Sequence, residues 1–382
     1  MQSKTMKQGW EIKKLGEVCT FQRGLTYSKD DEVEHSNNCV LRSNNIDLDS
    51  MSIVFDELKY INDDFVVSED KKVKPNTILI CMSNGSKQHI GKVAFIDKEY
   101  GYAFGGFMGL IKPNTEVSPK FIYYSCISSS YKHFLAGIGN GANITNLKFS
   151  DLQQYTLPVP PREEQESVVA ELDCLSGIIE KKREQLRELD ALAQSIFYQM
   201  FGDPNTNDRN WDVVKLNTTC DNLDYQRRPI TAKDRIEGDI PYYGASGVVD
   251  YVQDYIFDRD YLLVSEDGAN LEVRHTPIAF SIKGKTWVNN HAHILKFEHY
   301  CTQLFMEYYI NLLDISDIIT GCAQPKLTQA NLNSIEVFDI SIEKQQEFAD
   351  KIEAIEKQKE LIKKSISETE TLFNARMNDY FN

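Results

Sequence analysis

Apolar residues between positions 168 and 200 recur at spacings that alternate between four and three. Nine of the ten positions with this spacing are apolar, and the pattern continues for more than four heptads; the positions are 168, 172, 175, 179, 182, 186, 189, 193, 196 and 200, and Lys182 is the exception. It therefore predicts a coiled-coil seam and not the broader apolar face of a surface helix. Pro160-Pro161 before the pattern, and Gly202 and Pro204 after it, are typical signals for the start and the end of a helix.

A second stretch, between positions 348 and 380, carries a weaker version of the same spacing. Lys359, Thr369 and Arg376 interrupt its apolar residues, but the seam is still recognisable, so each predicted helix can be the partner of the other. The seam residues that we single out are Leu172, Leu175, Ile179, Leu186, Leu189, Ile352, Ile355, Ile362, Ile366 and Phe373.

The rest of the chain contains short apolar runs, such as 78–82, 261–264 and 278–282, separated by clusters of Gly, Asn and Asp. Such runs predict strands joined by turns, so we expect mixed α and β regions in which strands dominate, an α+β fold. The expected boundaries are a first globular domain at 1–157, a central long helix at 158–201, a second globular domain at 202–337 and a distal long helix at 338–382.

An internal duplication relates the two halves of the chain. Trp10 is followed by Leu15 and Cys19 with the same spacing as in the second half, at an offset of 201 residues. Seven further identities share an offset of 180, which makes the first globular region longer by 201 − 180 = 21 residues. These seven pairs begin with Leu147 and Leu327 and end with Phe201 and Phe381. A pseudo-twofold relation of this kind predicts that the helices run antiparallel.

Composition changes this picture in two respects. The longest apolar run is far shorter than the ~20 residues of a membrane helix, so we expect a cytoplasmic protein. No two of the eight cysteines have zinc-knuckle spacing, so we expect reduced thiols. The net charge of −15 argues against nucleic acid, whose binding depends on basic groups. The helices at 161–201 and 337–382 contribute −4 and −3 of it, so basic surfaces on the globular regions remain compatible with the total.

Several longer motifs occur in this framework. The Trp opening, the string LPVPPREEQ at 157–165 and the helix end SIFYQMFGD at 195–203 accompany the repeat, and the second globular region adds IPYYGASG at 240–247, EDGA at 266–269 and WVNNHAH at 287–293. Together they resemble the specificity subunit of type I restriction-modification enzymes, over essentially the whole chain. The first domain is less typical, and Ile340-Ser341-Ile342-Glu343 replaces the proline entry in the distal helix.

The resemblance implies two target-recognition domains, each of which reads one half of a split sequence in double-stranded DNA. It also implies two long helices that fix the separation of these domains and dock two methyltransferase (modification) subunits, together with restriction/translocase subunits. A chain of this kind is not itself an enzyme. It is expected to bind no cofactor, with S-adenosylmethionine, ATP and Mg on the partner subunits, and no membrane. A coiled-coil scaffold with two ligand-binding domains for protein partners is the alternative.

Catalytic and metal chemistry finds little support in the sequence. Pro160-Pro161 lacks the residues of a methyltransferase motif, and the glycine-rich segment 104–109 has the wrong spacing for a cofactor loop, so we assign its glycines to close packing. The nuclease-like set of Asp49, Glu57 and Lys59 is expected by chance among 57 acidic residues. A metal site could be built from Glu266, Asp267, His291 and His293, but polar packing or DNA contact is the preferred interpretation.

Base reading uses Arg or Lys toward guanine, Asn or Gln toward adenine, and hydroxyl or stacking contacts from Ser and Tyr. In each case the alternative is a solvated charge or a polar group that stabilises a turn. In the first domain these residue types select Arg23, Arg42, Asn44, Lys87, Gln88 and His89. In the second domain they select Arg227, Arg228, Tyr242, Tyr243, Ser246, Arg274 and Lys285. Candidates for phosphate contact near the helix junctions are Asn140, Asn143, Gln324 and Lys326.

Overall fold

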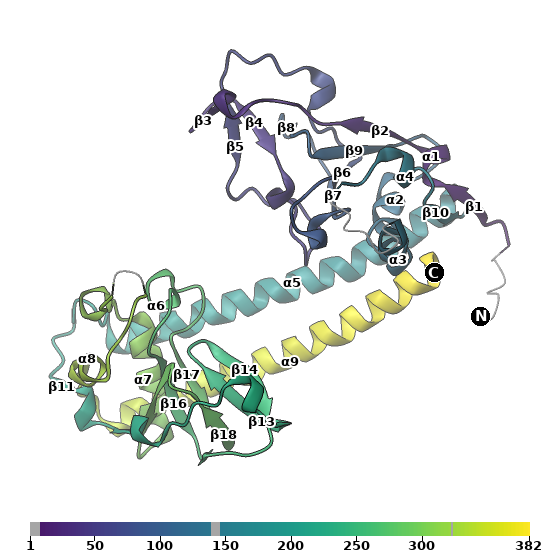
Figure 1. The fold of residues 1–382 in the computed structure, drawn as a ribbon. Helices are drawn as coiled ribbons and strands as arrows, with labels where there is room; N and C mark the ends of the chain where they lie inside the picture. Colours follow the sequence, from purple (N-terminus) through teal and green to yellow (C-terminus); the bar gives the residue numbers. More distant parts are fainter. Residues whose placement is uncertain (1–7, 139–145, 322–323) are drawn as a thin grey trace. The chain divides into compact units, whose positions relative to one another are not determined.

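The computed structural model describes residues 8–138, 146–321 and 324–382. The chain divides into two compact units. Unit 1 comprises residues 1–182 and 365–382, and unit 2 comprises residues 183–364. Each unit has a globular region and a segment of both long helices, α5 (Arg162–Phe201) and α9 (Ile342–Phe381) (Figure 1).

Two four-stranded sheets form the globular region of unit 1. The first is antiparallel with the order β2-β9-β6-β7, and the second has the order β3-β5-β4-β8 with β4 parallel to β8. Strand β6 is buried along its whole length, as expected for a continuous apolar run. The strands are β1 (Glu11–Lys14), β2 (Cys19–Arg23), β3 (Glu32–Val33), β4 (Asn38–Leu41), β5 (Lys59–Ile61), β6 (Thr77–Cys81), β7 (Val93–Ile96), β8 (Ala103–Phe104), β9 (Met108–Pro113) and β10 (Thr156–Val159). The short helices are α1 (Leu15–Val18), α2 (Pro119–Ser125), α3 (Ser129–Ile138) and α4 (Phe149–Leu152), with 3-10 turns η1 (Lys29–Asp31), η2 (Ser43–Asn45), η3 (Glu69–Lys71) and η4 (Lys87–His89).

Unit 2 repeats this arrangement. Its antiparallel sheet has the order β12-β19-β16-β17, and its second sheet has the order β14-β13-β18-β15 with β13 parallel to β18. The strands are β11 (Val213–Lys215), β12 (Asp221–Asn222), β13 (Glu237–Gly244), β14 (Gly247–Val252), β15 (Phe257–Asp258), β16 (Tyr261–Ser265), β17 (Ala279–Ile282), β18 (Lys285–Val288), β19 (Ala292–Lys296) and β20 (Glu336–Phe338). The helices are α6 (Asn270–Val273), α7 (Tyr300–Leu312) and α8 (Gln329–Ser334), with 3-10 turns η5 (Leu216–Thr218), η6 (Asp224–Gln226), η7 (Ala232–Asp234) and η8 (Ser316–Ile318).

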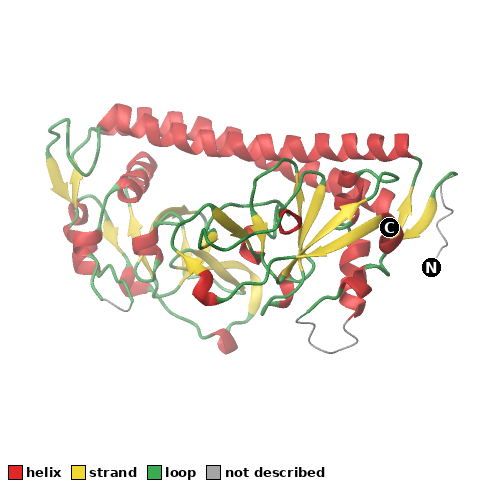
Figure 2. Cartoon of the chain, turned by 90° about the horizontal axis from the view of Figure 1, so that it is seen from above, coloured by secondary structure: helices red, strands yellow, loops and turns green. Residues whose placement is uncertain are grey.

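The duplication predicted from the sequence extends to the register of the strands. Leu79 pairs with Leu110 in unit 1, and Leu263 pairs with Ile294 in unit 2, so both strands of this pair share an offset of 184. The pairing of the first and last short strands, β1 with β10 and β11 with β20, is also repeated. Strands, loops and short helices are intermixed in the globular regions (Figure 2), which confirms the predicted α+β class.

The proline and glycine signals place the ends of α5 correctly, but the expected helix starts at 158 and 338 lie in strands β10 and β20, because these strands pair with β1 and β11 before the helices begin at Arg162 and Ile342. Helix α5 starts at Arg162, directly after the two prolines, and stops before Gly202, whose φ of 83° lies in the left-handed region. Each long helix contains 40 residues, or about 60 Å at 1.5 Å per residue. No helix in the described part of the chain is both long and apolar enough to cross a membrane.

The two helices pair antiparallel within each unit. In unit 1, Arg376 makes a bidentate ion pair with Glu171, at 2.6 and 2.9 Å, and Lys182 donates to Ser365 O at 3.4 Å. In unit 2, Lys359 pairs with Asp190 at 2.6 Å, and the ring centroids of Phe348 and Phe197 lie 5.7 Å apart. In both units a higher residue number on α5 therefore meets a lower residue number on α9, which confirms the predicted direction.

The seam is deepest where it enters the core of each globular region. In unit 1, Leu172 belongs to a core cluster with Met377 and Phe381, and in unit 2 Phe197 belongs to a cluster with Phe348. The seam positions nearer the middle of the helices are half-buried, namely Lys182, Leu186, Leu189, Lys359, Ile362, Ile366 and Thr369. Each helix segment is thus part of a domain core as well as of the coiled coil.

One buried glutamine per long helix explains part of the repeated sequence motif. Gln165 donates to Pro160 O at 2.9 Å and accepts from Ser118 N at 2.7 Å. Gln345, which lies 180 residues later, donates to a carbonyl five residues before it at 2.7 Å and accepts from the hydroxyl of Thr302 at 2.6 Å. The conserved spacing therefore fastens the start of each helix to its globular region.

Candidate nucleic-acid interface

A cavity of about 1040 Å³ lies in unit 1 where four segments that are distant in the sequence meet. They are the stretch 23–32 from the end of β2 to the start of β3, the loop after β4, residues 83–85 and the loop 105–107 with the first residue of β9, and Lys59 of β5 completes the lining. Arg23, Arg42 and Asn44 all belong to its lining. The fold therefore gathers three of the six base-reading candidates that were selected in the first globular domain.

Neighbouring loops hold the polar groups of this cavity in place. The backbone N–H of Arg42 donates to Asn45 Oδ1 at 2.9 Å, and Asn84 Nδ2 donates to Ser43 Oγ at 2.7 Å. Arg42 Nε is buried and has no hydrogen-bond partner among the described residues, while Arg23 Nε donates to a backbone carbonyl at a long 3.4 Å. A buried N–H without an acceptor is costly, so Arg42 Nε is an unsatisfied donor next to the cavity.

The other candidates of the first globular domain lie elsewhere. Lys87, Gln88 and His89 form the turn η4, outside the lining of the cavity. Burial and the charge of Lys92 lower the pKa of His89. The phosphate candidates Asn140 and Asn143 lie outside the described residues.

Strand register identifies the equivalent place in unit 2. The residue before Arg23 pairs with Leu110 on β9. Leu223 donates its backbone N–H to Ile294, the counterpart of Leu110 on β19, at 2.8 Å. Asp224, the next residue, therefore stands where unit 1 has Arg23.

The loops around the cavity have counterparts as well. The loop 289–291 between β18 and β19 has the same length as the loop 105–107 and follows the same parallel strand pair. In these parallel pairs, Tyr243 on β13 corresponds to Leu41 at the end of β4. Ser246 and Asn44 each follow three residues later in the sequence. The local structures differ, however, because Asn44 lies in the 3-10 turn η2 and Ser246 lies in the turn between β13 and β14.

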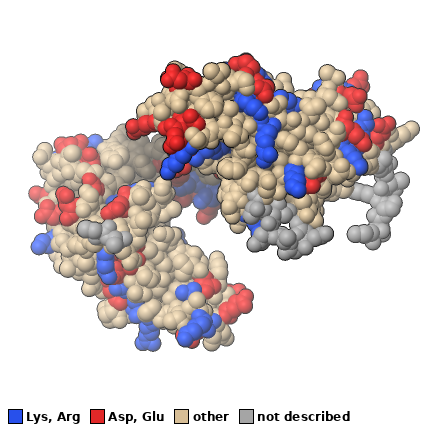
Figure 3. Space-filling view, turned by 45° about the horizontal axis from the view of Figure 1, so that its top comes forward, with Lys and Arg blue, Asp and Glu red and all other residues tan. Residues whose placement is uncertain are grey.

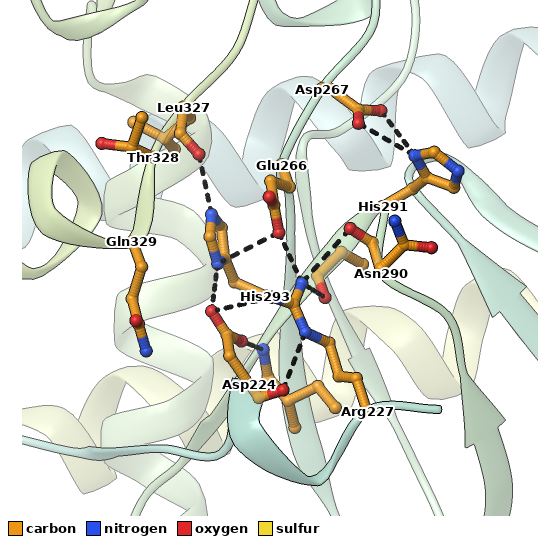
Figure 4. Close-up of polar contacts among 12 residues, drawn as sticks. Asp224, Arg227, Glu266, Asp267, Asn290, His291, His293, Leu327, Thr328 and Gln329 are labelled. Carbon is orange, nitrogen blue, oxygen red and sulfur yellow. Dashed lines mark hydrogen bonds and ion pairs between the residues drawn. The ribbon is translucent and has the colours of Figure 1, made fainter. Parts of the chain in front are cut away.

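An internal charge network fills this place in unit 2 (Figure 4). His293 Nδ1 lies 2.6 Å from Asp224 Oδ2, and Arg227 contacts both Asp224, at 3.4 Å, and Glu266. Lys326 Nζ lies 3.0 Å from the other oxygen of Glu266. The side chains of His293 and Asp224 are almost completely buried, so these charges compensate each other inside the unit.

Both carboxylates of the network are held in the ionised form. Burial by itself raises the pKa of Asp224, but the hydrogen bond and charge of His293, the Ile294 N–H and Arg227 outweigh it, and the pKa is lowered. Burial acts in the same direction on Glu266, where the hydrogen bonds of Arg227 and Lys326 outweigh it and also lower the pKa.

The same side chains resemble a metal site, because ligand atoms of Asp224, Glu266 and His293 lie within 4.8 Å of one another. Arg227, however, already places a guanidinium against both carboxylates, and His293 Nε2 lies 2.8 Å from Leu327 O. The protein's own cation thus satisfies the carboxylates, which favours the polar-packing interpretation.

His291 belongs to a separate surface pair. Its imidazole faces Asp267, at 2.9 Å, away from the buried network, and the His291 side chain is largely solvent-accessible (Figure 4). Lys and Arg are intermixed with Asp and Glu on the face of the protein drawn in Figure 3. Among the described residues, the face drawn in Figure 3 therefore has no broad basic surface, and its basic side chains lie in small groups beside acidic ones.

The family model described as the type I restriction modification DNA specificity domain matches residues 7–189 and again residues 208–371. The chain belongs to this family. The two matched regions confirm both the resemblance seen in the sequence and the internal duplication.

Curated relatives in the specificity family match parts of the chain. It is 28% identical over 202 residues to the type I restriction enzyme EcoKI specificity subunit of Escherichia coli, which is 53% of this chain and 44% of that protein. It is 34% identical over 112 residues to a putative specificity subunit of Haemophilus influenzae, 29% of this chain and 28% of that one. The aligned regions span less than half of these curated relatives.

Solved structures share the fold along the whole chain. A type I restriction-modification S subunit from M. genitalium superimposes with a TM-score of 0.59 at 14% identity, covering 100% of this chain and 98% of that one. A chain from a structural study of complex assembly and conformational transition of the type I R-M system gives a TM-score of 0.56 at 16% identity, with 99% of each chain covered.

In the second specificity domain, three of the candidates have internal partners. Tyr242 is 1% exposed, and its hydroxyl accepts from Ile230 N at 3.0 Å. Arg227 belongs to the charge network, and Arg274 donates to Leu271 O and Leu313 O at 3.1 and 3.0 Å. These side chains stabilise the domain, so the structure gives them roles other than base contact.

The remaining candidates of the second specificity domain are more accessible. Tyr243 is half-buried. Five candidates are exposed: Arg228, Ser246, Lys285, Gln324 and Lys326. Lys326 also belongs to the network through Glu266, and Lys285 lies over the ring of Tyr255 at 4.6 Å. Their contact with DNA stays a prediction.

Sequence reasoning did not select two residues that the fold makes prominent. Asp224 has the position of Arg23, and the offset of 201 between them was available from the Trp and Cys repeat. Phe107 lines the cavity of the first specificity domain at the tip of the glycine-rich segment, which had been assigned to packing alone. In both cases a signal existed, but only the fold shows what lies next to it.

Proposed function

We propose that this chain is the DNA-recognition subunit of a type I restriction-modification complex and that it reads a bipartite target in double-stranded DNA. The observation that carries the proposal is the presence of two specificity domains in one chain. Equivalent loops surround an open cavity in one domain and a charge network in the other. Two such sites with different side chains suit a target whose two halves differ in sequence.

The proposal assigns the chemistry to partners. The chain itself is non-catalytic and binds no cofactor, while two modification subunits hold S-adenosylmethionine, and restriction/translocase subunits use ATP and Mg. The exposed faces of α5 and α9 are the docking surface for the modification subunits in this proposal. Exposed apolar side chains on these helices, such as Leu192, Leu361 and Leu372, support that role.

Mapping of methylated adenines in the host genome, with and without this gene, tests the recognition role. A bipartite methylation motif should be present in the wild type and absent from the deletion strain, and it should return when the gene is restored. If no motif depends on the gene, the chain is not a recognition subunit. A protein-binding scaffold, the alternative function, predicts this second result.

Reconstitution tests the assignment of catalysis. The purified chain should transfer no methyl group from labelled S-adenosylmethionine to DNA, and it should permit transfer once the modification subunits are added. Methyl transfer by the rigorously purified chain alone would overturn the non-catalytic role.

A further inference from the structure

The loop between β8 and β9 presents an aromatic side chain to solvent. Phe107 is 71% exposed, although the residues on both sides of the loop, Phe104 and Met108, are buried. A single exposed apolar residue is common on protein surfaces and needs no explanation by itself. The rigidity of its backbone and the side chains around it are what distinguish Phe107.

Hydrogen bonds fix the backbone of this loop. The carbonyl of Phe107 accepts from Met82 N and Ser83 N at 2.8 and 3.1 Å. Gly105 N donates to Leu41 O at 2.9 Å, so both ends of the loop are fastened to neighbouring strands. The exposed ring is thus carried by a pre-organised backbone, as a recognition residue requires.

Glycines in and beside the loop allow the end of β2 to pack closely against its backbone. A Cβ atom at Gly24 would lie 2.0 Å from Gly105 O, so the end of β2 can approach the loop only without a side chain at this position. A Cβ at Gly106 would lie 3.2 Å from Leu25 O. Of the three loop residues, Gly105, Gly106 and Phe107, only Phe107 has a side chain.

The cavity beside the ring already holds groups that recognise polar base edges. Arg23 and Arg42 suit the acceptors of guanine, and Asn44 suits adenine. An apolar side chain such as Phe suits the one apolar group in the major groove, the 5-methyl group of thymine. The lining therefore carries groups suited to guanine, adenine and thymine in the major groove.

We propose that Phe107 is a specificity-determining residue that contacts the 5-methyl group of a thymine in the half-site read by unit 1. The inference rests on the proposed function and names one contact within it. Unit 2 has His291 at the equivalent loop position, with its imidazole turned to Asp267 at 2.9 Å. A thymine methyl is therefore not read by this loop in the second half-site.

Replacement of thymine by deoxyuridine, which removes only the methyl group, tests the proposal. The full chain is assembled with its modification subunits, and methylation rates are measured on duplexes carrying the genomic motif, with each thymine replaced in turn. One replacement, in one half-site, should slow wild-type methylation roughly fourfold, the effect of losing about 0.8 kcal/mol for one buried methyl group. The variant Phe107→Ala should methylate the thymine duplex more slowly by a similar factor, and the deoxyuridine replacement should have no further effect on its rate. The variant Phe107→Leu should keep part of the difference in rate between the two duplexes.

Two matched variants control the experiment. Val66, an apolar residue of unit 1 that is 88% exposed and outside the cavity lining, should give wild-type rates and wild-type dependence on the methyl group when changed to Ala. His291→Ala should leave the deoxyuridine effect intact. Because Phe107 is exposed, its variants should unfold at the same temperature as the wild type.

The outcomes separate this proposal from the proposed function. Absence of any gene-dependent motif refutes the proposed function and the contact with it. A gene-dependent motif in which no thymine replacement has an effect, or in which the effect is unchanged in Phe107→Ala, overturns the contact and leaves the proposed function standing.

Discussion

Arg23 in unit 1 and Asp224 in unit 2 have equivalent positions at the ends of corresponding strands, β2 and β12, but they carry opposite charges and have opposite surroundings. Arg23 is exposed at the rim of an open cavity, whereas Asp224 is buried among His293, Arg227 and Glu266. The strands around both residues have the same order and register. The two units of the duplicated fold thus share their strand order and register, but the side chains at this place are accessible to a ligand in unit 1 and compensate each other in unit 2.

The comparison teaches where the duplicated fold tolerates change. The sheets and the glutamine at the start of each long helix are repeated, because every one of these groups is buried and hydrogen-bonded in both units. The loops at the ends of the strands differ, because their side chains need only a scaffold to project from. Different loops on one scaffold are what two unlike half-sites would require.

The largest effect is expected when the network of unit 2 is broken. Arg227→Met leaves Asp224 and Glu266 buried without their guanidinium partner, so it should destabilise unit 2 by roughly 3–5 kcal/mol. Arg23→Met, the matched change in unit 1, should alter the free energy of unfolding by no more than about 0.5 kcal/mol because that side chain is exposed. Urea unfolding with peptide-resolved hydrogen exchange measures both, and equal effects would contradict the comparison.

The buried glutamines should behave alike in the two units. Gln165→Ala and Gln345→Ala each leave a buried donor, Ser118 N or the Thr302 hydroxyl, without its acceptor. Each change should therefore cost about 1–3 kcal/mol of stability in its own unit. Gln358→Ala, at an exposed position of α9, is the control and should have little effect. A loss in only one unit would show that the repeated motif has lost its structural role in the other.

Arg23→Ala should weaken binding without weakening the fold. Loss of one contact to a base edge should reduce the affinity for the target duplex by about 1–3 kcal/mol and relax one position in one half-site only. Fluorescence anisotropy at a fixed salt concentration measures the affinity, and methylome mapping measures the motif. Lys98→Ala removes the same charge from an exposed position outside the cavity, so equal losses in the two variants would indicate a non-specific electrostatic effect.

Acid should affect unit 2 through the network. The pKa values of Asp224 and Glu266 lie below their ordinary values of 3.8 and 4.5, so their stabilising contribution is complete above that range and is lost as the pH falls through it to the lowered values. Pepsin, which is active in this acid range, should begin to cleave residues 220–330 at a higher pH in the wild type than in the variant Asp224→Asn/Glu266→Gln, with cleavage of each protein normalised to its value at the highest pH tested. A variant with an unchanged profile would show that other groups control acid unfolding.

Local sequence signals were sufficient for the elements whose structure depends on near neighbours. The four-three spacing, the two prolines before Arg162 and the left-handed Gly202 place α5 correctly, since helix pairing and helix ends depend on residues within a few turns. The repeat at offsets of 201 and 180 correctly predicted a duplicated α+β fold. The residue types of Arg23, Arg42 and Asn44 were enough to select three side chains that line one cavity.

Only the tertiary structure decided which polar side chains remain available to a ligand. Tyr242 and Arg227 have the same residue types as good DNA-reading groups, but β13 turns the first into the core and the network of Asp224 and Glu266 binds the second. Phe107 had no signal beyond its glycines, and its significance comes from the polar groups beside it in the cavity, Arg23, Arg42 and Asn44, which are more than 60 positions away in the sequence. Long-range strand pairing sets these distances, and a pattern of neighbouring residues contains no information about which strands will meet.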